Sequence, residues 1–335
     1  GGSSSSGSGS IRCAATSSGS AVHAFIACNE YRQETVILER SARACGFAFR
    51  ALGVGGPWRG VGTKLVSYDR ALKELVGTEI HPSDPVLLLD AWDTVLLGPA
   101  EEFRAKLEEL GALGRGGLVV GAGDRINAPD YQLAPRMERH FPDICTPWRY
   151  PNSGCLAGTA SALRDFLHCL VHSAEAGGFS EEDDDQRRLQ EFILAVPDYP
   201  FQLDETCGLF QCMGEPERGW DFEPAPSTSR GASPSAGAAP LPRIRNWTTG
   251  ERPIVAHGCG GHGRWFLADI YRELRLLERL GVGPEDLAGI AYAGLVPPGE
   301  EVTWEHWVDQ PPWDFPFQVF NAMRAMELAK ECGVH

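Results

Sequence analysis

The stretch PVLLLDAWDTVLL, residues 85–97, decides how the fold is interpreted. It begins with an uninterrupted apolar run, which is typical of a strand buried on both faces in a parallel sheet. The run ends at Asp90, and a second carboxylate, Asp93, follows three residues later. Ligands of open α/β sheets bind at the carboxyl ends of the strands. The stretch therefore predicts a strand over residues 85–90 that leads directly into a candidate ligand site.

Segments of two kinds alternate around this strand. Apolar runs predict strands, and periodic segments between them predict helices. The expected strands are residues 21–28, 47–54 and 117–122, and the expected helices are residues 31–44, 63–76 and 100–110. This alternation is typical of an α/β fold. We therefore expect a mostly parallel central sheet with helices on both faces.

The second half of the chain is less regular, and its pattern predicts helices separated by short strands. The expected helices are residues 159–175, 181–194 and 264–280, and the expected short strands are residues 210–212 and 253–256. A stretch rich in Pro, Ser, Ala and Gly, residues 224–242, predicts a flexible surface loop inserted into this half.

Both ends of the chain are expected to lie outside the main domain, residues 21–281. Residues 1–20 are rich in Gly and Ser and predict a flexible linker. Residues 282–335 form an extension that carries Trp304, Trp307 and Trp313. We expect these aromatic side chains to pack back onto the domain, the alternative being an interaction surface.

Composition narrows the classes of function. The 335 residues include 30 Lys and Arg against 45 Asp and Glu, a formal net charge of −15. This balance argues against sequence-independent binding of nucleic acid, and bound phosphates would need a divalent cation to neutralise them. No apolar run approaches the roughly 20 residues of a membrane span. The ten cysteines include no CxxC pair, and Cys207 and Cys212 are expected either to cross-link or to remain free.

Asp90 and Asp93 are the first candidate metal ligands. Two hard oxygen ligands on one turn suit Mg²⁺ or Mn²⁺, which in turn holds a diphosphate. Trp92 lies between them and offers a flat face for a base or a sugar. The alternative interpretation is an Asp cap in a solvated turn.

His257 is the third candidate ligand, in the stretch AHGCGGHG, residues 256–263. It follows an expected strand and leads through Gly258 into a glycine-rich turn, where backbone can approach a phosphate closely. One imidazole with two carboxylates favours Mn²⁺ over Mg²⁺. Taken alone, His257 or His262 would more often be an ordinary loop histidine.

An acidic run, EEDDD at residues 181–185, precedes an expected helix. Acidic residues at such a position commonly complement the helix dipole, although five in succession exceed what capping requires. A carboxylate that faces a sugar can act as a base or stabilise positive charge at the anomeric carbon. The glycine-rich stretch 53–62, by contrast, does not fit a dinucleotide fingerprint, because Pro57 and Trp58 stand where the helix should begin.

Six motifs, taken in order, resemble one family. They are LGVGGPWRG, LLLDAWDTVL, PNSGCLAG, DDDQ, LDETCGLFQ and PIVAHGCG. Over residues 22–271 the chain resembles the glycosyltransferase domain of the multifunctional collagen lysyl hydroxylases, with the procollagen galactosyltransferases as nearest relatives. The resemblance implies a GT-A type, Rossmann-like fold, dependence on Mn²⁺, and UDP-glucose or UDP-galactose as the donor.

The resemblance also assigns roles to residues of this chain. It implies metal ligands at Asp90, Asp93 and His257. It implies that Asp184 and Asp185 are catalytic and face the transferred sugar and the acceptor. The residues implied in donor binding are Asn29, Trp58, Lys64, Trp92, Asn152, Ser153 and Gly154.

The expected function is transfer of glucose or galactose from a UDP-sugar to a hydroxyl acceptor, with a hydroxylated or glycosylated peptide such as hydroxylysine favoured. The alternatives are a non-catalytic nucleotide-sugar or glycan-binding module and a nucleotide-sugar hydrolase. Ala128 stands where the family has a tryptophan near the acceptor, which predicts a wider sugar pocket. The resemblance implies the lumen of the endoplasmic reticulum or Golgi, and the sequon at residues 246–248 fits that compartment.

Overall fold

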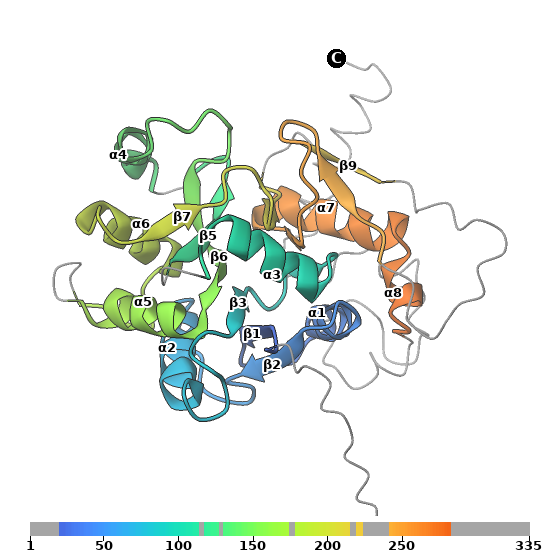
Figure 1. Cartoon of the computed structure of the whole chain (residues 1–335), viewed down its shortest axis with the longest axis horizontal. Helices are drawn as coiled ribbons and strands as arrows, with labels where there is room; N and C mark the ends of the chain where they lie inside the picture. Colours follow the sequence, from blue (N-terminus) through green and yellow to red (C-terminus); the bar gives the residue numbers. More distant parts are fainter. Residues whose placement is uncertain are drawn as a thin grey trace, which may run out of the picture.

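A six-stranded sheet lies at the centre of the fold (Figure 1). The computed structural model describes residues 20–113, 117–126, 130–173, 178–214, 219–223 and 241–282. Across the sheet the strands are β2 (Ala48–Leu52), β1 (His23–Ala27), β3 (Pro85–Leu89), β6 (Tyr150–Thr159), β5 (Leu118–Gly123) and β7 (Phe201–Leu203). The pairs are parallel except those that β6 makes with β3 and β5. The sheet is therefore mostly parallel, as predicted.

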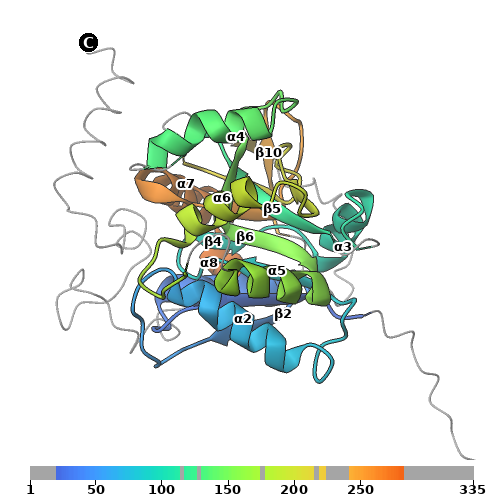
Figure 2. The same cartoon turned by 90° about the vertical axis from the view of Figure 1, so that its left-hand side faces the viewer.

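Helices cover both faces of this sheet, which also agrees with the prediction. One face carries α1 (Gln33–Ala44) and α3 (Ala100–Glu109). The other, toward the viewer in Figure 2, carries α2 (Thr63–Leu75), α5 (Ala160–His172) and α6 (Asp185–Ala195). Side chains alternate along β1, so that Ile26 packs into the first layer and Phe25 into the second.

β3 is buried along its whole length. Leu87 and Leu89 point into the layer with α1 and α3, and Val86 and Leu88 into the layer with α2, α5 and α6. Each buried leucine contributes roughly 1.5–3 kcal/mol relative to an exposed one. A strand covered on both faces needs this continuous apolar run, and it anchors the turn that follows at Asp90.

A three-stranded sheet lies beside the end of β3. β11 (Val255–His257) is its central strand, antiparallel to β4 (Thr94–Leu96) and parallel to β8 (Phe210–Cys212). α7 (Gly260–Glu273) packs against it through Leu267 and Ile270 (Figure 1). Because β4 follows β3 directly and pairs with β11, His257 lies opposite Thr94 and close to the Asp90–Asp93 turn.

Most of the expected helices and strands are present with slightly shorter bounds, but two expectations need correction. The helix expected over residues 264–280 is two helices, α7 and α8 (Leu276–Arg279), because Arg275 adopts a left-handed conformation with φ 50°. The helix expected from residue 181 begins only at Asp185. The acidic residues before Asp185 therefore lie in a turn.

The remaining elements were not predicted. β6 is the most important, because its opening residues PNSG look like a turn rather than a strand. The others are short: β4, β7, η1 (Asp130–Leu133), α4 (Ala134–His140), and the antiparallel pair β9 (Trp220–Phe222) and β10 (Ile244–Asn246).

Several predictions concern residues that the structure does not describe. Ala128 lies outside the described residues, as do the expected linker apart from Ser20, the expected loop apart from Leu241 and Pro242, and the tryptophan-rich extension apart from Val282. Within the described ranges, no helix has both the length and the apolar character needed to cross a membrane. Cys207 and Cys212 are both free thiols.

The sequon at residues 246–248 is buried rather than displayed. Asn246 is 0% exposed. Its Nδ2 donates to Gln211 Oε1 over 2.7 Å, and its Oδ1 accepts the backbone N–H groups of Thr248 and Thr249. A glycan would be attached at Nδ2, which is buried and already donates to Gln211. The sequon therefore does not support a lumenal location.

Candidate functional site

The turn between β3 and β4 holds Asp90 and Asp93 by backbone contacts. The N–H of Asp90 donates to Gly154 O over 2.9 Å, and Thr94 Oγ1 donates to Asp90 O over 2.6 Å. The N–H of Gly258 donates to Asp93 O over 2.6 Å. These bonds connect the turn to β6 on one side and to the end of β11 on the other, and they fix both carboxylates relative to His257.

His257 completes a cluster of three metal-ligating side chains. Its Nε2 lies 3.5 Å from Asp90 Oδ2 and 3.6 Å from Asp93 Oδ1. One ligand atom from each residue lies within 4.8 Å of the other two. His257 is 2% exposed, and within the described residues its Nε2 has no hydrogen-bond partner. A buried nitrogen without a partner, facing two carboxylates, fits a divalent cation with N and O ligands at about 2.0–2.2 Å.

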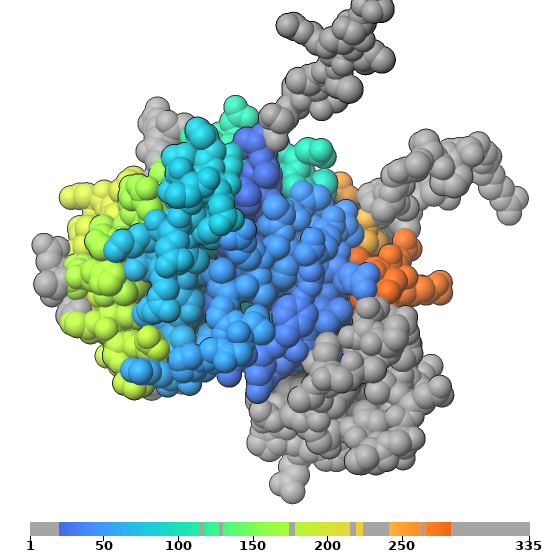
Figure 3. Space-filling view, turned by 90° about the horizontal axis from the view of Figure 1, so that it is seen from below, coloured from blue at the N-terminus to red at the C-terminus, as the bar shows by residue number. Residues whose placement is uncertain are grey.

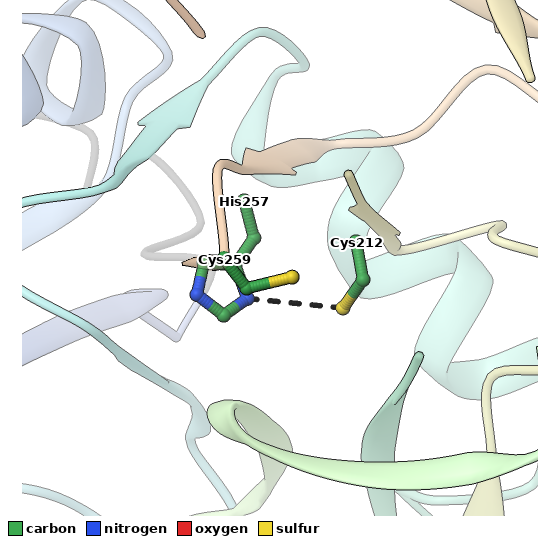
Figure 4. A group of neighbouring side chains, drawn as sticks. All are labelled: Cys212, His257 and Cys259. Carbon is green, nitrogen blue, oxygen red and sulfur yellow. Dashed lines mark hydrogen bonds between the residues drawn. The ribbon is translucent and has the colours of Figure 1, made fainter. Parts of the chain in front are cut away.

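The opposite nitrogen of His257 faces sulfur. Figure 4 shows Cys212 and Cys259 beside the ring, and His257 Nδ1 lies 3.7 Å from Cys212 Sγ. A hydrogen bond with Cys259, together with burial, raises the pKa of Cys212, so that its thiol stays protonated. In the tautomer that carries its proton on Nδ1, directed at this sulfur, the Nε2 lone pair faces the carboxylates. Neither cysteine was predicted at the site. Cys259 lies only two residues after His257, which is a local signal, whereas no local pattern connects Cys212 to His257.

Gly154 lies against the cluster with no room for a side chain. A Cβ at this position would lie 2.3 Å from His257 Cε1 and 2.5 Å from Asp90 Oδ2. The N–H of Gly154 donates to Asn152 Oδ1 over 2.9 Å, and the N–H of Ser153 donates to Gln186 Oε1 over 2.7 Å. This Asn-Ser-Gly segment of β6 thereby lies beside the cluster on one side and is bonded to α6 on the other.

Lys64, near the start of α2, joins the cluster to α6. Its Nζ lies 2.5 Å from Asp90 Oδ1 and 2.5 Å from Asp185 Oδ2. Burial acts to lower the pKa of Lys64, but the carboxylates of Asp185 and Asp90 outweigh it and hold this pKa well above its usual value. Burial acts to raise the pKa of Asp90, but Lys64 and His257 hold it below its usual value. The lysine is therefore charged and the aspartate ionised.

The two aspartates expected to be catalytic differ in their surroundings. Asp185 is buried against Lys64, whereas Asp184 is the N-cap of α6 and its Oδ1 accepts the N–H of Arg187 over 2.7 Å. The rest of the acidic run lies against the glycine-rich loop. A Cβ at Gly60 would lie 2.8 Å from the carbonyl oxygen of Glu181, and one at Gly62 would lie 2.8 Å from that of Asp183. The run therefore brings one carboxylate to the cluster and uses its neighbour for capping.

Two tryptophans predicted in donor binding lie near each other. The rings of Trp58 and Trp92 are 6.3 Å apart between centroids, with 44° between their planes. The guanidinium carbon of Arg32 lies 4.0 Å from the centroid of Trp92, a cation–π contact that was not predicted. Asn29 follows β1, and its carbonyl oxygen accepts the N–H of Gly55 over 2.8 Å, which ties the end of β1 to the glycine-rich loop.

Gly258 uses its backbone within the protein. Its N–H donates to Asp93, and a Cβ here would lie 2.7 Å from Gly263 O, so the position is needed for the close packing of β11 onto α7. Contact of Gly258 with a phosphate stays a prediction. The predicted residues that contact one another around the cluster are Asp90, Asp93, His257, Lys64, Asp185, Gly154 and Ser153, whose carbonyl oxygen accepts Lys64 Nζ over 3.4 Å.

Comparison with known proteins identifies the family. The family model described as PLOD GT domain matches residues 23–267, well over half of the chain. Among curated proteins there is no significant match. The apo structure of the bifunctional glycosyltransferase WbbM is 10% identical with a TM-score of 0.41, over 80% of this chain and 51% of that one. The present chain thus spans about half its length.

A second solved structure is a glycosyltransferase involved in glycosylation of the major capsid of PBCV-1. It is 14% identical with a TM-score of 0.34, over 56% of this chain and 84% of that one. Both TM-scores lie below 0.5, so the family model alone carries the assignment. The chain belongs to the family of PLOD GT domains, the glycosyltransferase domains of the lysyl hydroxylases, and it has an α/β fold.

Proposed function

We propose that this protein is a Mn²⁺-dependent glycosyltransferase that moves glucose or galactose from a UDP-sugar to a hydroxyl group. The observation that carries the proposal is the convergence of Asp90, Asp93 and the unpartnered Nε2 of His257. The three follow the carboxyl end of β3 or close β11, which is where ligands of open α/β sheets bind. One imidazole with two carboxylates favours Mn²⁺ over Mg²⁺.

Asp90, Asp93 and His257 would hold the ion, which would supply the positive charge that neutralises the leaving UDP. In a chain with a net charge of −15, this role falls to a cation because few basic groups are available. Lys64 adds one fixed positive charge beside Asp90, and Arg32 adds another over Trp92. Trp92 and Trp58 offer the flat faces on which a uracil ring would stack.

Asp185 is the residue proposed to act on the sugar or the acceptor. It is buried and lies next to Lys64, so its carboxylate is held in a fixed position. There it would orient the acceptor hydroxyl or stabilise positive charge at the anomeric carbon. Asp184 is the weaker candidate, because its Oδ1 is engaged in capping α6.

The acceptor proposed is a hydroxylated or glycosylated peptide such as one carrying hydroxylysine, because the family is that of the lysyl hydroxylases. A location in the lumen of the endoplasmic reticulum or Golgi follows from the same argument and is part of the proposal. The buried Asn246 lends it no support.

Thermal unfolding with UDP, with and without Mn²⁺, tests the donor site. A ligand at about a hundred times its Kd stabilises a protein by roughly 2.7 kcal/mol. We expect a rise in Tm that needs both UDP and Mn²⁺ and is lost in Asp93→Ala. The exposed Asp198→Ala serves as the matched control and should behave like the wild type. Wild type that fails to respond to UDP and Mn²⁺ together would refute the donor site.

A transfer assay separates the proposal from the two alternatives. Release of UDP that requires a hydroxylysine peptide, with the sugar recovered on that peptide, is the expected result. UDP released at the same rate with and without acceptor would instead indicate a hydrolase. Tight binding of UDP and Mn²⁺ with no turnover of either UDP-glucose or UDP-galactose would indicate a binding module.

A further inference from the structure

A second group of metal-ligating side chains lies on α2 and α5 and shares no residue with the Asp90–Asp93–His257 cluster. Asp69 belongs to α2, and His168 and His172 lie four residues apart on α5. One ligand atom from each lies within 4.8 Å of the other two. In the view from below, the surface of the segment around α2 (light blue) adjoins that of the segment around α5 (yellow-green) (Figure 3).

The Asp69 carboxylate is the buried part of this group. Asp69 is 7% exposed, and within the described residues its Oδ1 has no hydrogen-bond partner although it is shielded from water. His172 Nε2 lies 3.0 Å from Asp69 Oδ2, and His168 Nδ1 lies 3.9 Å from Asp69 Oδ1. A simple ion pair would account for His172 alone, and it would leave the buried Oδ1 and the approach of His168 unexplained.

The two histidines form the open part of the group. Their side chains are 61% and 53% exposed, so an ion can reach them directly from solvent. Their ring centroids are 4.7 Å apart. Residues four apart project from the same face of a helix, so the backbone itself keeps both imidazoles above Asp69.

We propose that Asp69, His168 and His172 bind a zinc ion. Two imidazoles and one carboxylate are a common set of protein ligands for Zn²⁺, with water in the fourth position. Imidazole nitrogen disfavours Mg²⁺ and Ca²⁺, which take oxygen ligands. Bond lengths of about 2.0–2.2 Å require the three ligand atoms to close on the ion, which rotation of the exposed imidazoles allows.

A zinc ion here would connect two helices that already pack together. Leu65, Tyr68 and Leu72 of α2 share an apolar cluster with Leu163 and Phe166 of α5. α2 also carries Lys64, which contacts Asp90 and Asp185. The site would therefore stiffen the helix that presents Lys64, while leaving the donor-site residues themselves free of zinc.

Titration of the full chain with Zn²⁺ alone, followed by calorimetry and by Tm, tests the proposal. We compare wild type with His168→Ala/His172→Ala and with His81→Ala/His140→Ala, which removes two other histidines. Besides any ion held by Asp90, Asp93 and His257, wild type and the control should bind one further equivalent with a Kd of about 1 µM or tighter and rise in Tm. The His168/His172 variant should lose that equivalent and that rise. The same isotherm in all three proteins would overturn the proposal.

The absorption spectrum of bound Co²⁺ identifies the ligand atoms. It distinguishes the proposed site from the alternative site at Cys212 and Cys259. Co²⁺ bound by imidazole and carboxylate absorbs in the visible range without a sulfur-to-metal charge-transfer band. A charge-transfer band that persists in the His168/His172 variant would locate the ion at Cys212 and Cys259 and overturn the proposal. Asp69→Asn, which keeps the size of the side chain, should weaken Zn²⁺ binding. All these variants should keep the Tm response to UDP and Mn²⁺. The zinc-site proposal and the donor-site proposal can therefore be refuted independently.

Discussion

Two groups of carboxylates, the Asp90–Asp93 turn and the acidic run at residues 181–185, differ in how their surroundings use them. In the turn, both side chains face His257, because the backbone on either side is bonded to β6 and β11. In the acidic run, Asp183 Oδ2 accepts the N–H of Ser180 over 2.6 Å and Asp184 caps α6, and Asp185 alone is buried against Lys64.

The difference follows from the element that each group adjoins. Carboxylates at the carboxyl end of a buried strand have no helix dipole to complement, and a second strand can bring a ligand opposite them. Carboxylates that precede a helix are first recruited by its unpaired N–H groups. Acidic residues after a buried strand are therefore the better indicator of a metal centre, and those before a helix must be tested one at a time.

Gly154→Ala should have the largest effect, because the added methyl group would fill the space between β6 and the metal-ligating side chains. The added Cβ would collide with His257 and Asp90, so overpacking should cost about 1–3 kcal/mol of stability. Displacement of the ligands by about 1 Å should cost roughly a hundredfold in turnover. Turnover and the Tm response to UDP and Mn²⁺ are measured together. Gly178→Ala, where an added Cβ meets nothing within 4 Å, is the control, and equal behaviour of the two variants would contradict the prediction.

Asp185→Asn should have the next largest effect and tests the buried member of the acidic run. Loss of a group that acts in general acid–base catalysis typically costs about a hundredfold or more. We expect kcat to fall by that factor while the Tm response to UDP and Mn²⁺ is kept. The control is Asp183→Asn, because Asp183 is exposed and its Oδ2 accepts the N–H of Ser180 within the same turn. Equal loss of kcat and of UDP binding would instead indicate that Asp185 only supports the structure around Lys64.

Local sequence patterns were sufficient to predict those helices and strands whose conformation follows from their own residues. β3 and β5 are continuous apolar runs, and α1 to α3 are periodic, so each follows from its own residues. β6 could not be predicted in this way, because its residues 151–154 have turn composition, and the pairing of Pro151 and Asn152 with β5 extends this part of the strand. The break at Arg275 gives no local signal, since it is not a glycine.

The candidate site was predictable to the extent that its residues follow strands. Asp90, Asp93 and His257 were inferred from their positions after two expected strands, and the structure brings them together. The contact between Lys64 and Asp185 joins the starts of α2 and α6, and no pattern within either helix encodes it. The pairing of His257 with Cys212 depends on β8 lying beside β11, which only the folded sheet reveals.

Asp204 extends the comparison to a carboxylate with a structural role, which lies outside the candidate site. Its carboxylate accepts the backbone N–H groups of Gly208, Leu209 and Phe210, where β8 begins. Burial raises the pKa of Asp204 to about 6, although these N–H groups act in the opposite direction.

The folded protein therefore keeps this proton to a higher pH than the unfolded chain, in which Asp titrates near pH 4. The free energy of unfolding should fall as pH rises from about 4 to about 6, by roughly 2–3 kcal/mol from this group. Urea titrations across that range should show the dependence in wild type and in Asp198→Asn. Asp204→Asn, which resembles the protonated carboxyl, should lack it. Parallel pH profiles for all three proteins would exclude a titrating Asp204.

Asp184→Ala should have the smallest effect. It tests whether Asp184 only caps α6 while Asp185 acts at the site. Loss of the N-cap should lower the free energy of unfolding by about 1 kcal/mol. Asp184→Asn is the matched control, because asparagine caps as well as aspartate and should restore that stability. Transfer activity should stay within about twofold of wild type in both variants, since neither removes Asp185 from Lys64. The contrary result would be that Asp184→Ala and Asp184→Asn both lose as much activity as Asp185→Asn. It would mean that the negative charges at positions 184 and 185 both act on the substrate. It would also mean that Asp184 stops capping α6 when substrate binds.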